Sequence, residues 1–173
     1  MSGEHIWIGD FVNRLEQGLI AEKVGTATKN LYGLVGFESN PREIAVGGAK
    51  MGTAAAFVQA ANNLKIYGGI EDGWESLKHV VDSYPLRSEG AGNLILITDE
   101  DRDNTMSTIT YSSLLNSIQE KGIILNAVVN ARFRCGDGRS ALGVDFTGTG
   151  YVADGAGGFS TCSNANAYSG FGS

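Results

Sequence analysis

The sequence predicts an α/β fold, with a mostly parallel central sheet flanked by helices and a Gly/Ser-rich segment at the C-terminal end. Two observations lead to this prediction. Stretches with helical hydrophobic spacing alternate with short, continuously apolar runs over residues 4–130, as in parallel sheets with helical crossovers. The pattern then dissolves into sequence rich in glycine, serine and asparagine. The length of 173 residues suits one domain with a single core.

The first half of the chain is predicted to place two strands between two helices. Apolar residues at helical spacing indicate an amphipathic helix over residues 4–22. The apolar run at residues 31–39 fits a buried strand, and residues 42–48 fit a second strand that ends at glycines. The alanine-rich stretch at residues 52–64 predicts the second helix.

The second half of the chain repeats this alternation. Residues 71–84 are predicted to form a helix, because two acids at its start suit the positive end of a helix dipole. The continuous apolar run at residues 93–98 predicts a central parallel strand that is covered on both faces. Residues 107–122 predict another helix, and residues 123–130 predict another apolar strand.

The composition indicates where the domain ends and which partners it excludes. We expect an α/β domain over residues 1–146 and an irregular tail over residues 147–173, whose composition cannot bury much apolar surface. The net charge of -6 argues against a nucleic-acid partner, which requires clustered Lys and Arg. No apolar run approaches the length of about 18 residues that spans a bilayer. The N-terminus lacks the features of a signal peptide.

Two cysteines, Cys135 and Cys162, leave two alternatives open. Their glycine-rich surroundings lack the paired spacing of a zinc site. They form either a disulfide that ties down the last segment, in an oxidising compartment, or two unrelated thiols.

A group of acids comes after the predicted strand at residues 93–98. Asp99, Glu100 and Asp101 lie directly after this strand, and Asp72 begins the helix that precedes it. Ligands of open α/β sheets bind at the carboxyl ends of the strands, so both acidic loops are expected at that edge. Carboxylate oxygens are ligands for Mg²⁺ and Ca²⁺. The alternatives are therefore a divalent-cation site, or a helix cap together with a solvated loop.

Other motifs do not support catalysis. The stretch GGAKMGT at residues 47–53 lacks the Lys-Ser/Thr pair of a phosphate loop after its second glycine. His79 is expected in mid-helix at or near the surface, and His5 has no visible partner. Since no cysteine or serine is paired with a histidine in a nucleophile pattern, we expect no enzymatic activity.

Three motifs in order, LYGLVGF, GGIEDGW and LITDE, make residues 4–130 resemble the von Willebrand factor A domain. The resemblance implies a Rossmann-like fold and an adhesion or ligand-binding role through a metal-ion-dependent adhesion site. Asp99 matches the acid of the third metal loop of the family. Asp72 stands where family members place a coordinating threonine, and Glu100 is a further candidate. The cation would be Mg²⁺ or Ca²⁺.

The chain departs from the family pattern at its start. Its MSGEH resembles the family segment directly after the Asp-x-Ser-x-Ser loop, so that loop and the first strand are absent and the site is partial, and it could be empty. Without this strand, the apolar strands at residues 31–37 and 94–98 would have unpaired edges. We therefore expect a longer protein, or a gap filled by the chain's own C-terminal segment or by another chain.

The leading functional prediction is a secreted, extracellular binding module for adhesion, matrix or filament assembly. Its partner would be a protein or matrix ligand, or a second copy in self-association, without a membrane span or a nucleic acid. The alternative is a Mg²⁺-dependent α/β hydrolase or phosphotransferase that uses Asp99 and Asp101. That chemistry requires an aspartyl nucleophile and a lysine, and neither is recognisable.

Overall fold

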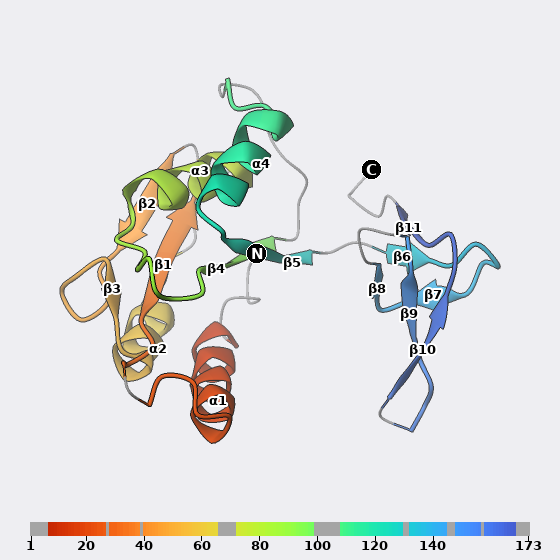
Figure 1. Ribbon diagram of the computed structural model, residues 1–173, viewed down its shortest axis with the longest axis horizontal. Coiled ribbons are helices and arrows are strands. Elements are labelled where there is room, and N and C mark those ends of the chain that lie inside the picture. The colour runs from red at the N-terminus through yellow and green to blue at the C-terminus, as the bar shows by residue number, and fades with distance from the viewer. Residues whose placement is uncertain are drawn as a thin grey trace. The chain divides into compact units, whose positions relative to one another are not determined.

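A computed structural model gives the protein a mixed α/β architecture (Figure 1). The chain divides into two compact units. The first unit comprises Met1–Leu96 and Arg102–Ala127, and the second comprises Ile97–Asp101 and Val128–Ser173. The structure describes residues 7–26, 28–38, 40–65, 72–98, 108–129, 132–144, 148–156 and 158–168.

Four helices are found among the described residues, at the places where the sequence predicts them. Two of them begin at threonine caps: the Thr53 hydroxyl accepts from the Ala56 N–H, and Thr110 forms a capping box with Ser113. These caps explain why the helices start later than the apolar periodicity suggests. The helices are α1 (Ile8–Ala21), α2 (Ala54–Asn62), α3 (Gly73–Ser83) and α4 (Tyr111–Glu120).

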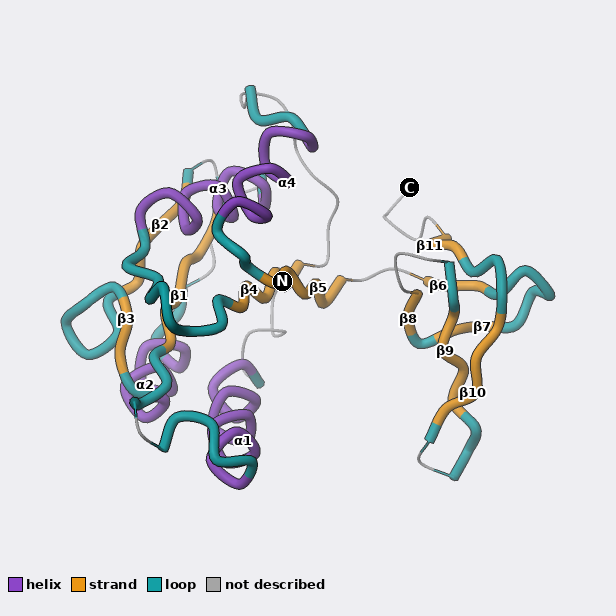
Figure 2. Tube along the Cα trace, viewed as in Figure 1, coloured by secondary structure: helices purple, strands orange, loops and turns teal. Residues whose placement is uncertain are grey.

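The strands up to residue 129 form two small sheets (Figure 2). In one, β1 (Tyr32–Phe37) pairs antiparallel with β2 (Pro41–Ile44) and β3 (Met51–Gly52). In the other, β4 (Asn93–Thr98) pairs with β5 (Ile124–Val129), and this is the one parallel pair in the described part of the chain.

The mostly parallel sheet that the sequence predicts is therefore reduced to one pair among the described strands. Connection length explains the difference. Only residues 38–40 separate β1 from β2, and such a short link allows a hairpin but not a crossover. Between β4 and β5 the chain passes through α4, so these strands can run parallel.

The core of the first unit lies between helices and strands. One cluster packs α3 against α4, which lie side by side in Figure 1. It consists of Leu77, Val81, Leu114, Ile118 and Ile123. Elsewhere α1 packs against α2, where Val12, Phe57 and Ala61 are buried. The apolar spacing of each helix predicts these buried faces.

The second unit contains short antiparallel strands, and the last three of them lie within residues 147–173, where the sequence predicts an irregular tail. A disulfide joins Cys135 to Cys162, with 5.8 Å between their Cα atoms. This crosslink and the backbone ladders hold strands together without requiring large apolar side chains. The strands are β6 (Arg132–Arg134), β7 (Ser140–Ala141), β8 (Gly143–Val144), β9 (Gly150–Ala153), β10 (Phe159–Cys162) and β11 (Asn166–Tyr168). They form the sheets β10-β9-β8 and β11-β6-β7.

None of the helices in the described ranges is long and apolar enough to cross a membrane.

Candidate metal site at the start of α3

Asp72 is the N-cap residue of α3, and its side chain is only 4% exposed. Its Oδ1 atom accepts hydrogen bonds from the backbone N–H of Trp74 at 3.0 Å and of Glu75 at 3.3 Å. These bonds satisfy two donors that the first turn of a helix otherwise leaves open. The structure therefore gives Asp72 the capping role that its position before a helix predicts, and holds its carboxylate in one place.

Gly73 brings the start of α3 close to two strands. A Cβ atom at this position would lie 3.1 Å from Leu96 Cδ1 and 3.8 Å from Phe37 Cε2. Phe37 is the last residue of β1, and Leu96 lies near the end of β4. The start of the helix that Asp72 caps therefore lies close to side chains of these two strands.

The other predicted ligands, Asp99 and Glu100, lie outside the described residues, and so does Asp101. Asp99 comes directly after the last residue of β4 in the sequence. Within the described ranges, no group of three or more His, Cys, Asp or Glu side chains could hold a metal ion. The structure accordingly positions one of the three predicted ligands.

Ser76 is a buried polar residue that is not among the site residues predicted from the sequence. It lies in α3 four residues after Asp72 and is 5% exposed. Its hydroxyl oxygen is buried and forms no hydrogen bond with the residues that the structure describes. The sequence does contain a signal for the burial of Ser76, because the residue falls between Gly73 and Leu77 on the apolar side of the helix.

A second polar cluster joins β2, the turn before β3 and α3. Glu43 Oε1 lies 2.5 Å from Lys50 Nζ and 2.8 Å from His79 Nε2. The hydrogen bond from Lys50, and then that from His79, holds the pKa of the Glu43 carboxyl below its usual range. All three side chains are partly exposed to solvent.

This cluster does not form a nucleophile triad. Ser83 Oγ lies 3.3 Å from His79 Nε2, the same ring nitrogen that contacts Glu43. A triad uses one ring nitrogen for the hydroxyl and the other for the carboxylate. The Ser83 hydroxyl also donates to the backbone carbonyl of His79 at 2.6 Å. The geometry thus fits a structural ion pair between β2 and α3.

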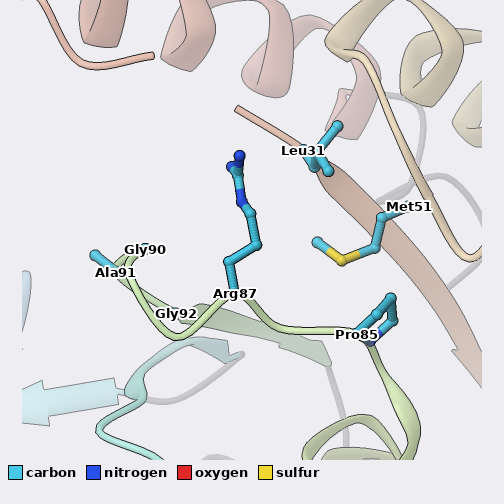
Figure 3. A pocket seen from close by; sticks show the side chains of 7 residues that line it. All are labelled: Leu31, Met51, Pro85, Arg87, Gly90, Ala91 and Gly92. Carbon is cyan, nitrogen blue, oxygen red and sulfur yellow. The ribbon is translucent and has the colours of Figure 1, made fainter. Parts of the chain in front are cut away.

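A shallow pocket lies on the first unit (Figure 3). Asp72 is not among the residues that line it, and none of these residues is acidic. Its volume is about 60 Å³, far below the roughly 300 Å³ of a small-molecule site. The Arg87 guanidinium beside it donates to the Lys29 carbonyl at 2.9 Å. The lining residues are Leu31, Met51, Pro85, Arg87, Gly90, Ala91 and Gly92. The pocket offers no ligand set for a cation.

Comparison of the chain with family models, with curated proteins and with solved structures gives no match. The resemblance to the von Willebrand factor A domain therefore rests on the three quoted motifs, and its functional implications are proposals.

Proposed function

We propose that this chain is an extracellular, A-domain-like binding module that holds a divalent cation and works in adhesion, matrix or filament assembly. The observation that carries the proposal is the buried carboxylate of Asp72, held at the start of α3 by its hydrogen bonds to the helix backbone. Burial of a carboxylate costs free energy unless partners compensate it, so such groups concentrate at functional sites.

The ligand set of the proposal is Asp72, Asp99 and Glu100, with Mg²⁺ or Ca²⁺ as the cation. A carboxylate has about four lone-pair positions, so capping a helix and binding a metal are compatible roles for one aspartate side chain. The proposed roles of Asp99 and Glu100 as cation ligands rest on their positions in the sequence, directly after β4. Oxygen ligands of this kind suit hard cations.

The apolar surface of β5 supports a protein partner. Ile124 is 57% exposed, Leu125 is 40% exposed and Val128 is 46% exposed. Parallel strands are normally covered on both faces, and in the described part of the chain β5 pairs only with β4. We infer that a protein ligand, or a second copy of the chain, covers this strand in the working assembly.

We extend the proposal to the arrangement of the strands. β1 and β4 both approach the start of α3, yet they belong to different sheets. A strand between them, donated by another chain or another segment, would join the two sheets into a Rossmann-like parallel sheet. Such donation by an extended segment is also a route to filament assembly.

The disulfide is compatible with an extracellular location, because disulfides persist in oxidising compartments. We propose that the chain is secreted.

Thermal unfolding in the presence of Mg²⁺, Ca²⁺ or a chelator tests the proposed cation site. A cation that binds the folded state raises the melting temperature by mass action. We expect this rise in the wild type and its loss in Asp72→Asn and Asp99→Asn. Asp82→Asn is the matched control, because Asp82 is an exposed acid on the same helix that pairs with Lys78.

Equal melting temperatures with and without chelator in the wild type would refute the cation site. Turnover of a generic phosphate ester that depends on Mg²⁺ and on Asp99 would instead support a hydrolase and contradict the proposed function.

A further inference from the structure

The second unit buries very few apolar side chains. Among its described residues, the buried ones are those of Cys135, at 4% exposure, and Ala165, at 3%. The first unit, by contrast, buries larger side chains such as those of Phe57, Leu77 and Val81. A small unit with so little buried apolar surface depends on a crosslink, a metal or a partner for its stability.

The disulfide between Cys135 and Cys162 takes the place of an apolar core in this unit. A Cβ atom on Gly150 would lie 2.6 Å from Cys162 Sγ and 2.6 Å from Ala165 Cβ. The sulfur and the alanine methyl group therefore lie directly on the backbone of β9, at a glycine that is itself buried. The interior of the unit is thus built around the disulfide, with two small residues packed against it.

The same bond joins the two sheets of the second unit. Cys162 is the last residue of β10, in the sheet β10-β9-β8, and Cys135 directly follows β6, in the sheet β11-β6-β7. Beside the bond, the Gly136 N–H donates to the Ser163 carbonyl at 3.0 Å. The two cysteines are 27 residues apart in the sequence, so the crosslink also restricts the unfolded segment. Reduction of the bond removes both the packing and this restriction.

The chemistry of reduction follows from the different exposure of the two cysteines. Cys162 is partly exposed, whereas Cys135 is buried, so a thiolate of a dithiol reductant approaches from the side of Cys162. Its attack on Cys162 Sγ forms a mixed disulfide, breaks the Sγ–Sγ bond and releases the Cys135 thiolate, which takes up a proton. The second thiolate of the reductant then displaces Cys162. The products are two protein thiols and one oxidised dithiol.

We propose that the Cys135–Cys162 bond is a redox switch for the second unit: its two-electron reduction unfolds this unit, and the first unit keeps its fold. The first unit contains no cysteine, and its buried apolar side chains lie in the range from Ile8 to Ile123. The switch makes the folded state of the second unit depend on an oxidising compartment. It is independent of the proposed cation site, so either can fail without the other.

Hydrogen–deuterium exchange of the wild-type chain, oxidised and after treatment with dithiothreitol, tests the switch. Alkylation and mass spectrometry give the number of reduced cysteines in the same samples. We expect the ratio of folded to unfolded second unit to fall on the order of a hundredfold on reduction, so that the amides of β9 and β10 lose protection. We expect the amides of α3 and α4 to exchange equally in both samples. Reoxidation with glutathione disulfide should restore the protection of β9 and β10.

Two variants complete the test. The double variant Cys135→Ala/Cys162→Ala should exchange like the reduced wild type and should not respond to dithiothreitol. Ser160→Ala is the matched control, because Ser160 is an exposed residue of β10 and its substitution leaves the disulfide in place. This control should exchange like the oxidised wild type.

Several results would overturn the inference. One is a bond that dithiothreitol does not reduce in the folded protein, and another is protection of β9 and β10 that survives reduction of both cysteines. Loss of protection in α3 and α4 on reduction would show that unfolding is not confined to the second unit. Protection that reoxidation does not restore would show that the bond is not a switch.

Discussion

At the scale of single residues, Asp72 caps α3, and its proposed second role in cation binding can be separated from the cap by substitution. Its Oδ1 atom caps α3 through the N–H groups of Trp74 and Glu75, and its negative charge is what the proposed cation requires. Asparagine caps helices about as well as aspartate but carries no charge. The two roles therefore respond differently to Asp72→Asn and Asp72→Ala.

We predict that Asp72→Ala lowers the free energy of unfolding by about 1 kcal/mol in chelator, because the cap is lost. Asp72→Asn should stay within a few tenths of a kcal/mol of the wild type under the same conditions. Urea denaturation followed by circular dichroism measures both. Equal destabilisation by the two variants would mean that the charge, and not the cap, stabilises α3.

Ser76 shows the limit of prediction for single residues. The acid before α3 is visible in the sequence because aspartate is a common N-cap residue. A serine inside a helix is normally exposed, so nothing in its type indicates burial. Its position on the apolar side of α3 is the signal that the sequence offers, and the packing of α3 against neighbouring elements shows that this hydroxyl is enclosed.

At the scale of elements, the ion pairs of Glu43 connect β2 to α3. The pKa of Glu43 is lowered in the folded protein, first by Lys50 and then by His79. A carboxyl whose pKa is lowered by folding stabilises the folded state above its unfolded pKa, for which the ordinary value is 4.5. That stabilisation is lost as the pH falls through the lower, folded value.

We predict that Glu43→Gln is less stable than the wild type at neutral pH and that this difference shrinks as the pH falls below 4.5. Urea denaturation of both proteins across the acidic range gives the difference at each pH. A difference that stays constant or grows towards low pH would contradict a Glu43 pKa lowered by folding.

The bounds of some elements were predicted more accurately than those of others, and the differences have physical causes. The strand at residues 93–98 has the same bounds in the sequence prediction and in the structure, because its apolar run is continuous. The second strand ends at Ile44, earlier than predicted. Gly47 and Gly48 adopt positive φ angles of 65° and 87° and turn the chain, with a bridge from Val46 to Ala49.

The C-terminal strands could not be predicted from composition. Apolar periodicity is the main signal for a strand, and residues 147–173 have little of it. Backbone hydrogen bonds between β9 and β10 do not depend on side-chain type. The pairing of Cys135 with Cys162 depends on their distance in space, which two cysteines in a sequence do not reveal.

At the scale of the whole molecule, two features of the described residues would be explained by the proposed assembly. One is the exposed apolar strand β5, and the other is the separation of β1 and β4 into different sheets beside one helix. An isolated pair of strands is marginally stable in water. Both features agree with a module that completes its sheet in an assembly, and the proposed cation would organise the neighbouring strand ends.

The most direct test of this account is the amount of cation bound by the purified protein. Equilibrium dialysis of the chelator-treated wild type against Ca²⁺ or Mg²⁺, followed by elemental analysis, gives that amount. We predict saturable binding that approaches one ion per chain and is lost in Asp72→Asn, which keeps its helix cap. A wild type that binds no ion, or an Asp72→Asn protein that binds as much as the wild type, would contradict it.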